Sequence, residues 1–137
     1  MSHSTIRIAA AVLIDKDGQT LLVRKRGTQA FMQPGGKIDA GEQPVEALAR
    51  ELYEELNLRI DPADAVYLGQ FSAPAANEPG FTVQAEMFQL HIGVAVTPAA
   101  EIEEIRWIDP MGDGGVHLAP LSRDQILPLY RASLTPA

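Results

Sequence analysis

The sequence predicts a single α+β domain in which a mixed β-sheet is flanked by helices. Several short segments rich in Val, Ile and Leu are bounded by turn residues, which is typical of strands. One segment near the middle carries a strong helical pattern of apolar residues. The chain has 137 residues, of which 46% are hydrophobic, so we expect one compact domain over residues 1–137.

The first third of the chain predicts two strands and a loop. Thr5 to Ile14 is almost continuously apolar and favours a buried strand. Asp15 to Gly18 is a turn in which we expect Gly18 to take a positive φ. Thr20 to Arg26 then predicts the returning strand of a hairpin, and Gly27 to Gly36 a loop.

Pro44 to Leu56 gives the strongest helical signal in the sequence. Pro44 suits the first turn of a helix. Apolar residues recur at helical spacing and predict one buried face, made of Val45, Leu48, Ala49, Leu52 and Leu56.

The second half of the chain predicts further strands and a last helix. The expected strands are Leu58 to Ile60, Ala65 to Phe71, Phe81 to Ile92 and Ile102 to Ile108. Ala73 to Gly80 and Met111 to Gly115 are expected to be loops. Ser122 to Tyr130 predicts a helix capped by Ser122 and kinked or ended near Pro128.

The composition excludes several classes of protein. Eleven Lys and Arg against 18 Asp and Glu give a formal net charge of −7, which argues against general affinity for nucleic acid or an anionic membrane. The chain has no cysteine, so disulfides, thiolate zinc sites and thiol nucleophiles are excluded. The polar N-terminus does not resemble a signal peptide, and the apolar stretches are too short to span a bilayer. We therefore expect a cytoplasmic protein.

Three carboxylates lie close together on the central helix. Glu51, Glu54 and Glu55 occupy positions i, i+3 and i+4, so their like charges repel unless something neutralises them. A hard divalent cation with oxygen ligands would do so. Glu55 is nearest the apolar face and should be the least exposed, with Glu51 and Glu54 further toward solvent. The alternative is a solvated acidic face with an ion pair between Glu46 and Arg50.

The segment before the helix favours the first interpretation. Counting from Gly36, the sequence has five residues, Glu42, seven residues, Arg50-Glu51-Leu52, one residue, Glu54-Glu55, one residue, then Asn57-Leu58. This pattern resembles the Nudix box, and eight of its nine fixed positions match between Gly36 and Leu58. Asn57 stands where the family usually has glycine. Because Asn tolerates the left-handed conformation next best, we expect Asn57 to have a positive φ.

The resemblance implies a Nudix-type α/β/α sandwich and a hydrolase that needs Mg²⁺ or Mn²⁺. The implied metal ligands are Glu51, Glu54 and Glu55, joined by the carbonyl oxygen of Gly35. A glutamate would remove a proton from the attacking water, and Glu51 and Glu54 are both candidates. Glu101, in the later acidic segment, is a candidate for an additional ligand or base, or else lies on a solvated strand edge.

Two further box residues are expected to support the catalytic carboxylates. Glu42 would act through the metal shell or through Arg50, and Arg50 would orient the carboxylates.

The candidates for binding substrate lie before the helix. One of the three cations at positions 24–26 is expected to meet a phosphate, and Arg26 is favoured. Phe31 would border the pocket or else anchor its loop, and Lys37 ends the same loop. His3, His91 and His117 do not have the spacing of metal ligands.

The implied substrate is a nucleoside diphosphate linked to another group. We rank an ordinary or oxidised nucleoside triphosphate first. The alternatives are ADP-ribose or another nucleotide sugar, a dinucleoside polyphosphate, or a nucleotide-sensing module that has lost catalysis. Specificity is expected from the loops Ala73 to Gly80 and Met111 to Gly115. A small nucleotide is the expected partner, nucleic acid and membrane are not, and a homodimer is left open.

Overall fold

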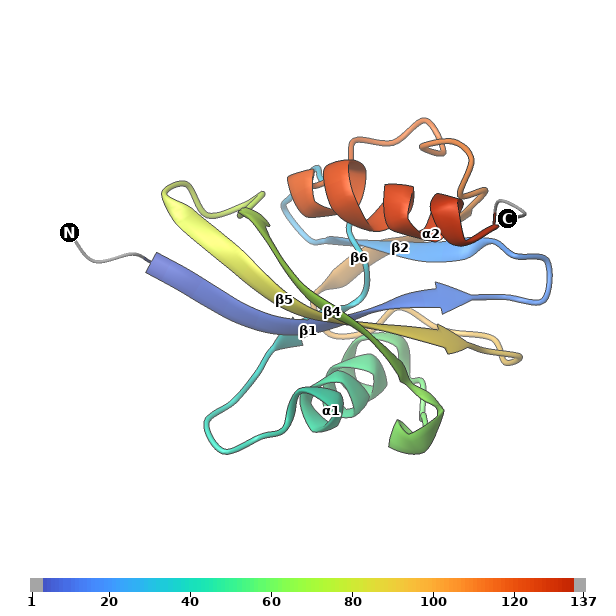
Figure 1. The fold of residues 1–137 in the computed structure, drawn as a ribbon, viewed down its shortest axis with the longest axis horizontal. Coiled ribbons are helices and arrows are strands. Elements are labelled where there is room, and N and C mark those ends of the chain that lie inside the picture. Colours follow the sequence, from blue (N-terminus) through green and yellow to red (C-terminus); the bar gives the residue numbers. More distant parts are fainter. Residues whose placement is uncertain (1–3, 135–137) are drawn as a thin grey trace.

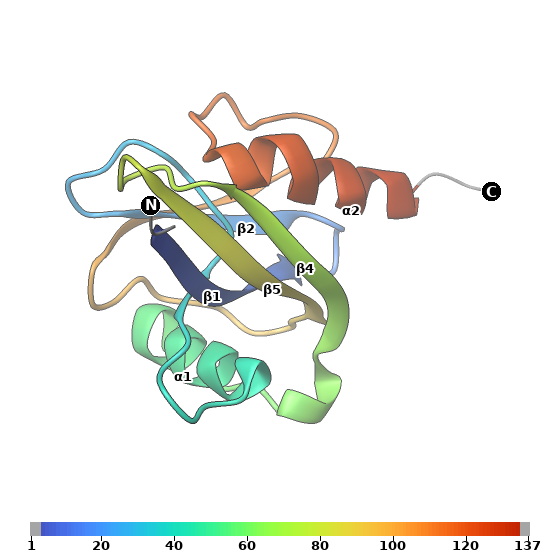
Figure 2. The same cartoon turned by 60° about the vertical axis from the view of Figure 1, so that its left-hand side comes forward.

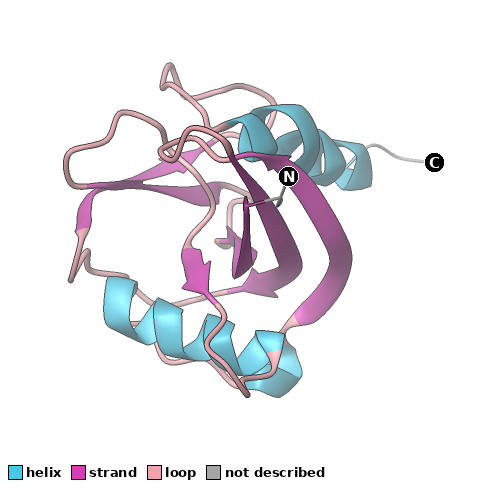
Figure 3. Cartoon of the chain, turned by 90° about the vertical axis from the view of Figure 1, so that its left-hand side faces the viewer, coloured by secondary structure: helices cyan, strands magenta, loops and turns pink. Residues whose placement is uncertain are grey.

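The computed structural model describes residues 4–134 and has three layers. One helix, α1 (Pro44–Leu56), covers one face of a six-stranded sheet. On the opposite face lies a C-terminal helical segment. It is made of a widened turn of π-helix (Ser122–Ile126) followed by α2 (Leu127–Leu134). Figures 1 and 3 show the two helical layers on opposite sides of the sheet. The expected α/β/α sandwich is therefore confirmed.

The sheet is mixed. Its strands are β1 (Ser4–Ile14), β2 (Thr20–Lys25), β3 (Gly35–Lys37), β4 (Val66–Pro74), β5 (Phe81–His91) and β6 (Ile102–Ile108). The order is β4-β5-β1-β2-β6, with β3 also paired to β1. β1 and β5 are parallel, and the other pairs are antiparallel. Figure 2 shows β1, β5 and β4 side by side between the helices.

The predicted hairpin of the first two strands is paired only at its tip, and the segment after it is not all loop. β1 and β2 pair at Ile14 and Thr20 and then diverge. The returning chain lies between them: Met32 bridges to Val23 of β2, and β3 pairs with β1. This segment satisfies the backbone groups that the divergence of β1 and β2 leaves unpaired.

β1 is buried on both faces because it is the central strand, which explains its continuous apolar sequence. Alternate residues contact different helices. Those that face α1 are Ala9, Ala11 and Leu13, which pack with Leu48, Leu52 and Leu56. Those that face the C-terminal helical segment are Ala10, Val12 and Ile14, which pack with Leu121, Ile126 and Tyr130.

α1 has the predicted bounds. Its N-terminus is capped by Glu46, whose Oε1 accepts a hydrogen bond from the Gln43 backbone N–H at 2.8 Å. Its C-terminus ends at Asn57, with φ 53° and ψ 34°, so the expected left-handed conformation is confirmed. The Leu58 backbone N–H donates to the Leu52 carbonyl, which closes the turn.

Three further predicted elements differ. β4 extends to Pro74, so Ala73 and Pro74 belong to this strand and not to the expected loop Ala73 to Gly80. Residues 58–60 form no strand, because the chain leaves the α1 turn with Leu58 buried against the helix rather than beside a strand. Ser122 does not cap a helix, since the hydroxyl donates to Gln33 Oε1 at 2.6 Å. The helix also continues past Pro128 to Leu134. Helical backbone runs without a break from residue 120, so Pro128 lies inside the helical run, directly after the widened turn in which the Leu127 N–H donates to the Ser122 carbonyl.

His3 lies outside the described residues. Within residues 4–134, neither helix has the length and apolar character needed to cross a bilayer.

Candidate active site

The three box carboxylates differ sharply in burial. Glu55 is only 2% exposed, whereas the side chains of Glu51 and Glu54 are 14% and 49% exposed. Glu55 is therefore the least exposed, as expected, but Glu51 is less exposed than predicted. Neither carboxylate oxygen of Glu55 has a hydrogen-bond partner within residues 4–134. A charged group in that position needs a cation or a proton.

The pKa of Glu55 reflects this burial. Desolvation raises the pKa of the carboxyl to about 7, and the charge of Glu51 acts in the same direction. Two groups act in the opposite direction and more weakly than the desolvation. The charge of Lys25 lowers the pKa of Glu55, and the Gly35 backbone N–H also lowers it, although this N–H forms no hydrogen bond of normal geometry with the carboxylate. Glu51 also has a raised pKa, mainly through burial and despite contact with Arg50.

Arg50 joins the helix to the loop that precedes it. Nε and Nη2 donate to the two carboxylate oxygens of Glu42 at 2.8 and 2.9 Å, and Nη1 donates to Glu51 Oε1 at 2.9 Å. Nη2 also donates to the Lys37 carbonyl at 3.0 Å. Glu54 is held more loosely, with Oε2 3.6 Å from Nη1. The hydrogen bond from Arg50, and then the Asp39 backbone N–H, hold the pKa of Glu42 at about 2.

These contacts contradict the alternative of an ordinary solvated helix face. Arg50 pairs with Glu42 and Glu51, while Glu46, its proposed partner, caps the helix instead.

The two glycines before Lys37 allow the backbone to pack closely. A Cβ on Gly36 would lie 2.3 Å from Glu51 Cδ, so the carboxylate of Glu51 rests directly on the Gly36 backbone. Gly35 has φ +152°, and a Cβ there would lie 2.1 Å from the Ala9 carbonyl oxygen. β3 can therefore pair with β1 and pack against α1 at this distance only with glycine at both positions.

Of the three cations at the end of β2, Lys25 is the one near the carboxylates. Lys25 continues the row of Leu21 and Val23 that packs against α1, and its charge lowers the pKa of both Glu51 and Glu55. Arg26, the residue favoured from the sequence, instead lies 3.6 Å from Glu103. Strand alternation together with the helix-facing residues could have identified Lys25.

Glu101 lies near Lys25 and Glu55, at the C-terminal end of α1. Its Oε1 is 3.3 Å from Lys25 Nζ, and its charge raises the pKa of Glu55. The segment before it is fixed to α1, because the Ala99 backbone N–H donates to the Glu55 carbonyl at 2.8 Å.

Arg24 and Phe31 lie on the opposite face. Phe31 is 5% exposed in a cluster with Leu22 and Leu127, and the guanidinium of Arg24 is 5.9 Å from the centre of its ring. Phe31 therefore anchors its loop in the core, one of the two roles considered for it.

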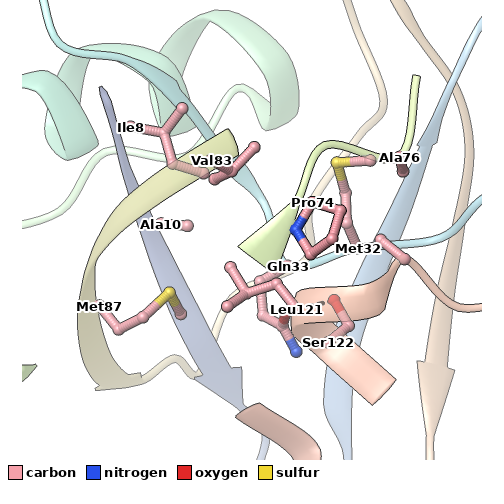
Figure 4. Close-up of a pocket in the computed structure, with 11 residues that line it drawn as sticks. Ile8, Ala10, Met32, Gln33, Pro74, Ala76, Val83, Met87, Leu121 and Ser122 are labelled. Carbon is pink, nitrogen blue, oxygen red and sulfur yellow. Dashed lines mark hydrogen bonds between the residues drawn. The ribbon is translucent and has the colours of Figure 1, made fainter. Parts of the chain in front are cut away.

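A groove passes Lys25, Gly35, Gly36 and Lys37 and continues into an apolar pocket. The groove and the pocket share Ile8, Met32, Gln33, Ala76 and Val83. The pocket is also lined by Ala10, Pro74, Met87, Ala119, Leu121 and Ser122. Figure 4 shows these side chains around the hollow. The loop at 75–78 borders the groove, so part of the expected specificity loop Ala73 to Gly80 lies at the site.

The chemistry of the donor groups fits a hard divalent cation. Glu55 supplies two buried oxygens that lack partners in the described part of the chain, and Glu51 and Glu54 lie beside it on α1. Among residues 4–134, no three Asp, Glu or His side chains are arranged to bind one ion together. Glu54 is half-exposed and can change rotamer, so the carboxylates can converge when a cation is present.

Comparison with known proteins relates most of the chain to one family. The model of the NUDIX domain matches residues 5–113. An 8-oxo-dGTP diphosphatase of Haemophilus influenzae is 38% identical over 78 residues, which are 54% of this chain and 57% of that protein. An RNA pyrophosphohydrolase of Tolumonas auensis is 42% identical over 50 residues, 36% of this chain and 29% of that protein. The chain thus spans less than two thirds of either relative.

The fold matches a solved structure over nearly its whole length. The MutT protein from Methanosarcina mazei superposes with a TM-score of 0.81 and 20% sequence identity, covering 99% of each chain.

Proposed function

Because this chain belongs to the NUDIX domain family, we propose that it is a metal-dependent pyrophosphohydrolase. Its substrate would be a nucleoside diphosphate linked to another group, and we rank a nucleoside triphosphate first. We also propose that residues 1–137 form one catalytic domain that acts in the cytoplasm. The proposal rests on the burial of Glu55. This side chain is 2% exposed, and its carboxylate oxygens have no hydrogen-bond partner within residues 4–134.

The cation would be Mg²⁺ or Mn²⁺, held by Glu51, Glu54 and Glu55, with the Gly35 carbonyl and Glu101 as further candidates. When bound, such an ion neutralises charge on phosphate oxygens and makes a bound water more acidic. The chain's own contribution is to fix these carboxylates. Arg50 performs that role for Glu51, because it is itself held by both oxygens of Glu42.

The reaction we propose is attack of water on a phosphorus atom of the diphosphate. A new phosphorus–oxygen bond forms, and the bridging bond breaks with its electron pair on the departing phosphate. The proton of the water passes to a glutamate. We favour Glu54 over Glu51 for this role, because Glu51 accepts a hydrogen bond from Arg50 whereas Glu54 is 49% exposed and loosely held.

The groove supports the placement of an anionic substrate in a chain of net charge −7. Lys25 and Lys37 line it beside the Gly35-Gly36 backbone, so they offer local positive charge for the phosphates. We propose Lys25 and Lys37 as phosphate contacts, with Lys25 in place of Arg26. The neighbouring apolar pocket would then take the base.

A substrate panel tests the proposal directly. Nucleoside triphosphates, ADP-ribose and dinucleoside polyphosphates are incubated with Mg²⁺ or Mn²⁺, and the released phosphates are identified. We expect a nucleoside monophosphate and pyrophosphate from a triphosphate, and loss of most turnover in Glu55→Gln. Glu103→Gln is the matched control, because Glu103 is half-exposed and pairs with Arg26. Full activity in excess chelator, or near-wild-type turnover of Glu55→Gln, would contradict the metal assignment.

A further inference from the structure

The apolar pocket contains one buried amide whose donor group is unused. Gln33 is 6% exposed and lines both the pocket and the groove. Its Oε1 accepts a hydrogen bond from the Ser122 hydroxyl at 2.6 Å. Its Nε2 has no hydrogen-bond partner anywhere in residues 4–134. Figure 4 shows Gln33 beside Leu121 and Ser122 in the wall of the pocket.

The surroundings make this free donor unusual. The pocket wall around Gln33 is otherwise formed mostly by apolar side chains, among them Ile8, Met87 and Leu121. A buried N–H without a partner is unfavourable, so such groups in folded proteins mark a place where a ligand or water completes the contact. Because Ser122 occupies the carbonyl end of the amide, the group that completes the contact must accept a hydrogen bond.

We propose that Gln33 reads the nucleobase, with its Nε2 donating to an exocyclic oxygen of the base. The inference rests on the proposed action on nucleotides and specifies their class as those with an oxo group at the position where adenine carries an amino group. An amino group there would oppose donor to donor and leave both groups unpaired. The groove shares Gln33 with the pocket, so a base held there has its phosphates toward Gly35 and Gly36.

Ser122 has a positioning role in this proposal. Its hydroxyl lies on the C-terminal helical segment and fixes the carbonyl end of the amide, which leaves the buried nitrogen unpaired within residues 4–134. Without that hydroxyl the amide can rotate by half a turn and present its oxygen to the base. The preference for an oxo group would then be lost, although Gln33 still carries its N–H donor.

The test uses two ligands that differ in the exocyclic group at position 6 and in the proton on the neighbouring ring nitrogen N1. Inosine monophosphate carries a 6-oxo group and adenosine monophosphate a 6-amino group. Their dissociation constants are measured by titration calorimetry without metal for the wild type and for Gln33→Met, Gln33→Glu and Ser122→Ala. The wild type is expected to bind inosine monophosphate about tenfold more tightly, the ratio that one net hydrogen bond gives.

Each variant has its own expected ratio. Gln33→Met keeps the side-chain volume but cannot donate, so the ratio should fall to about one. Gln33→Glu presents an acceptor, so it should weaken inosine monophosphate most. Ser122→Ala should lower the ratio while leaving Gln33 in place. A wild-type ratio of one, a preference for the amino base, or an unchanged ratio in Gln33→Met would overturn the inference. Because the wild-type ratio alone can do so, a variant that fails to fold does not remove the test.

Failure of this inference can be separated from failure of the proposed hydrolysis. Binding of a monophosphate requires neither a metal nor turnover. A tenfold ratio without hydrolysis of any member of the panel would support base reading and contradict the enzyme. Hydrolysis with a ratio of one would support the enzyme and contradict the role of Gln33.

Discussion

Removing the charge of Glu55 should change how the stability of the metal-free protein depends on pH. The pKa of the carboxyl is 4.5 when unperturbed and about 7 in the folded chain. Between these values the native state binds more protons than the unfolded state, so the free energy of unfolding falls as pH rises. The shift corresponds to about 3 kcal/mol in full, and to roughly 2 to 3 kcal/mol between pH 5 and pH 8.

Urea unfolding in the presence of chelator measures this effect. The free energy of unfolding is determined at both pH values for the wild type and for Glu55→Gln. The stability of the variant relative to wild type should be greater at pH 8 than at pH 5 by the amount above. Any constant cost of burying the new amide cancels in this comparison. Glu54→Gln is the control, because it removes a carboxylate of the same helix that is half-exposed rather than buried.

Added Mg²⁺ gives a second readout from the same samples. A cation that binds only the folded state raises the free energy of unfolding by mass action. At pH 8 the wild type should be stabilised by Mg²⁺ and Glu55→Gln much less. If the difference between wild type and Glu55→Gln is the same at pH 5 and pH 8, the Glu55 carboxyl is not desolvated and the reasoning is refuted.

Three further predictions follow from backbone and side-chain geometry. Asn57→Gly should be tolerated, whereas Asn57→Val should lower the free energy of unfolding by about 1 to 3 kcal/mol, since a β-branched residue strains the left-handed turn. Thermal unfolding measures this, and a valine variant that unfolds at the wild-type midpoint would contradict it. Gly36→Ala should reduce kcat by about tenfold or more, because its Cβ would lie 2.3 Å from Glu51 Cδ. Gly93→Ala is the control, because the space around its Cβ is open. Equal values of kcat for the two variants would contradict the packing argument. Lys25→Met should raise KM for an anionic substrate more than Arg26→Met does, and the reverse order would return the phosphate contact to Arg26.

Local signals were enough to predict α1 and its end. Pro44, the apolar spacing and Asn57 each act through neighbouring residues, and the structure has the helix with the predicted bounds and the predicted left-handed stop. The burial of Glu55 was also predictable, because its position on the helix surface follows from the 3.6-residue period.

What was missed depends on contacts between distant segments. Ser122 has the residue type of a helix cap, but its hydroxyl bonds Gln33, 89 positions earlier in the chain. β3 is a strand because β1 and β2 diverge and leave room for it, which no local pattern in Gly35-Gly36 encodes. Lys25 differs, since alternation from Leu21 and Val23 places it on the helix-facing side of β2.

The parallel pairing of β1 with β5 has a consequence for folding during synthesis. Ser4 pairs with Phe81 and Ile14 with His91, so each residue of β1 pairs with a residue of β5 that is synthesised 77 positions later. Until β5 emerges from the ribosome, the apolar strand β1 has one unpaired edge, and contacts of such long range are slow to form. Truncated chains that stop before Phe81 should therefore carry α1 and the box glutamates without a completed sheet beneath them, and they should be prone to aggregate.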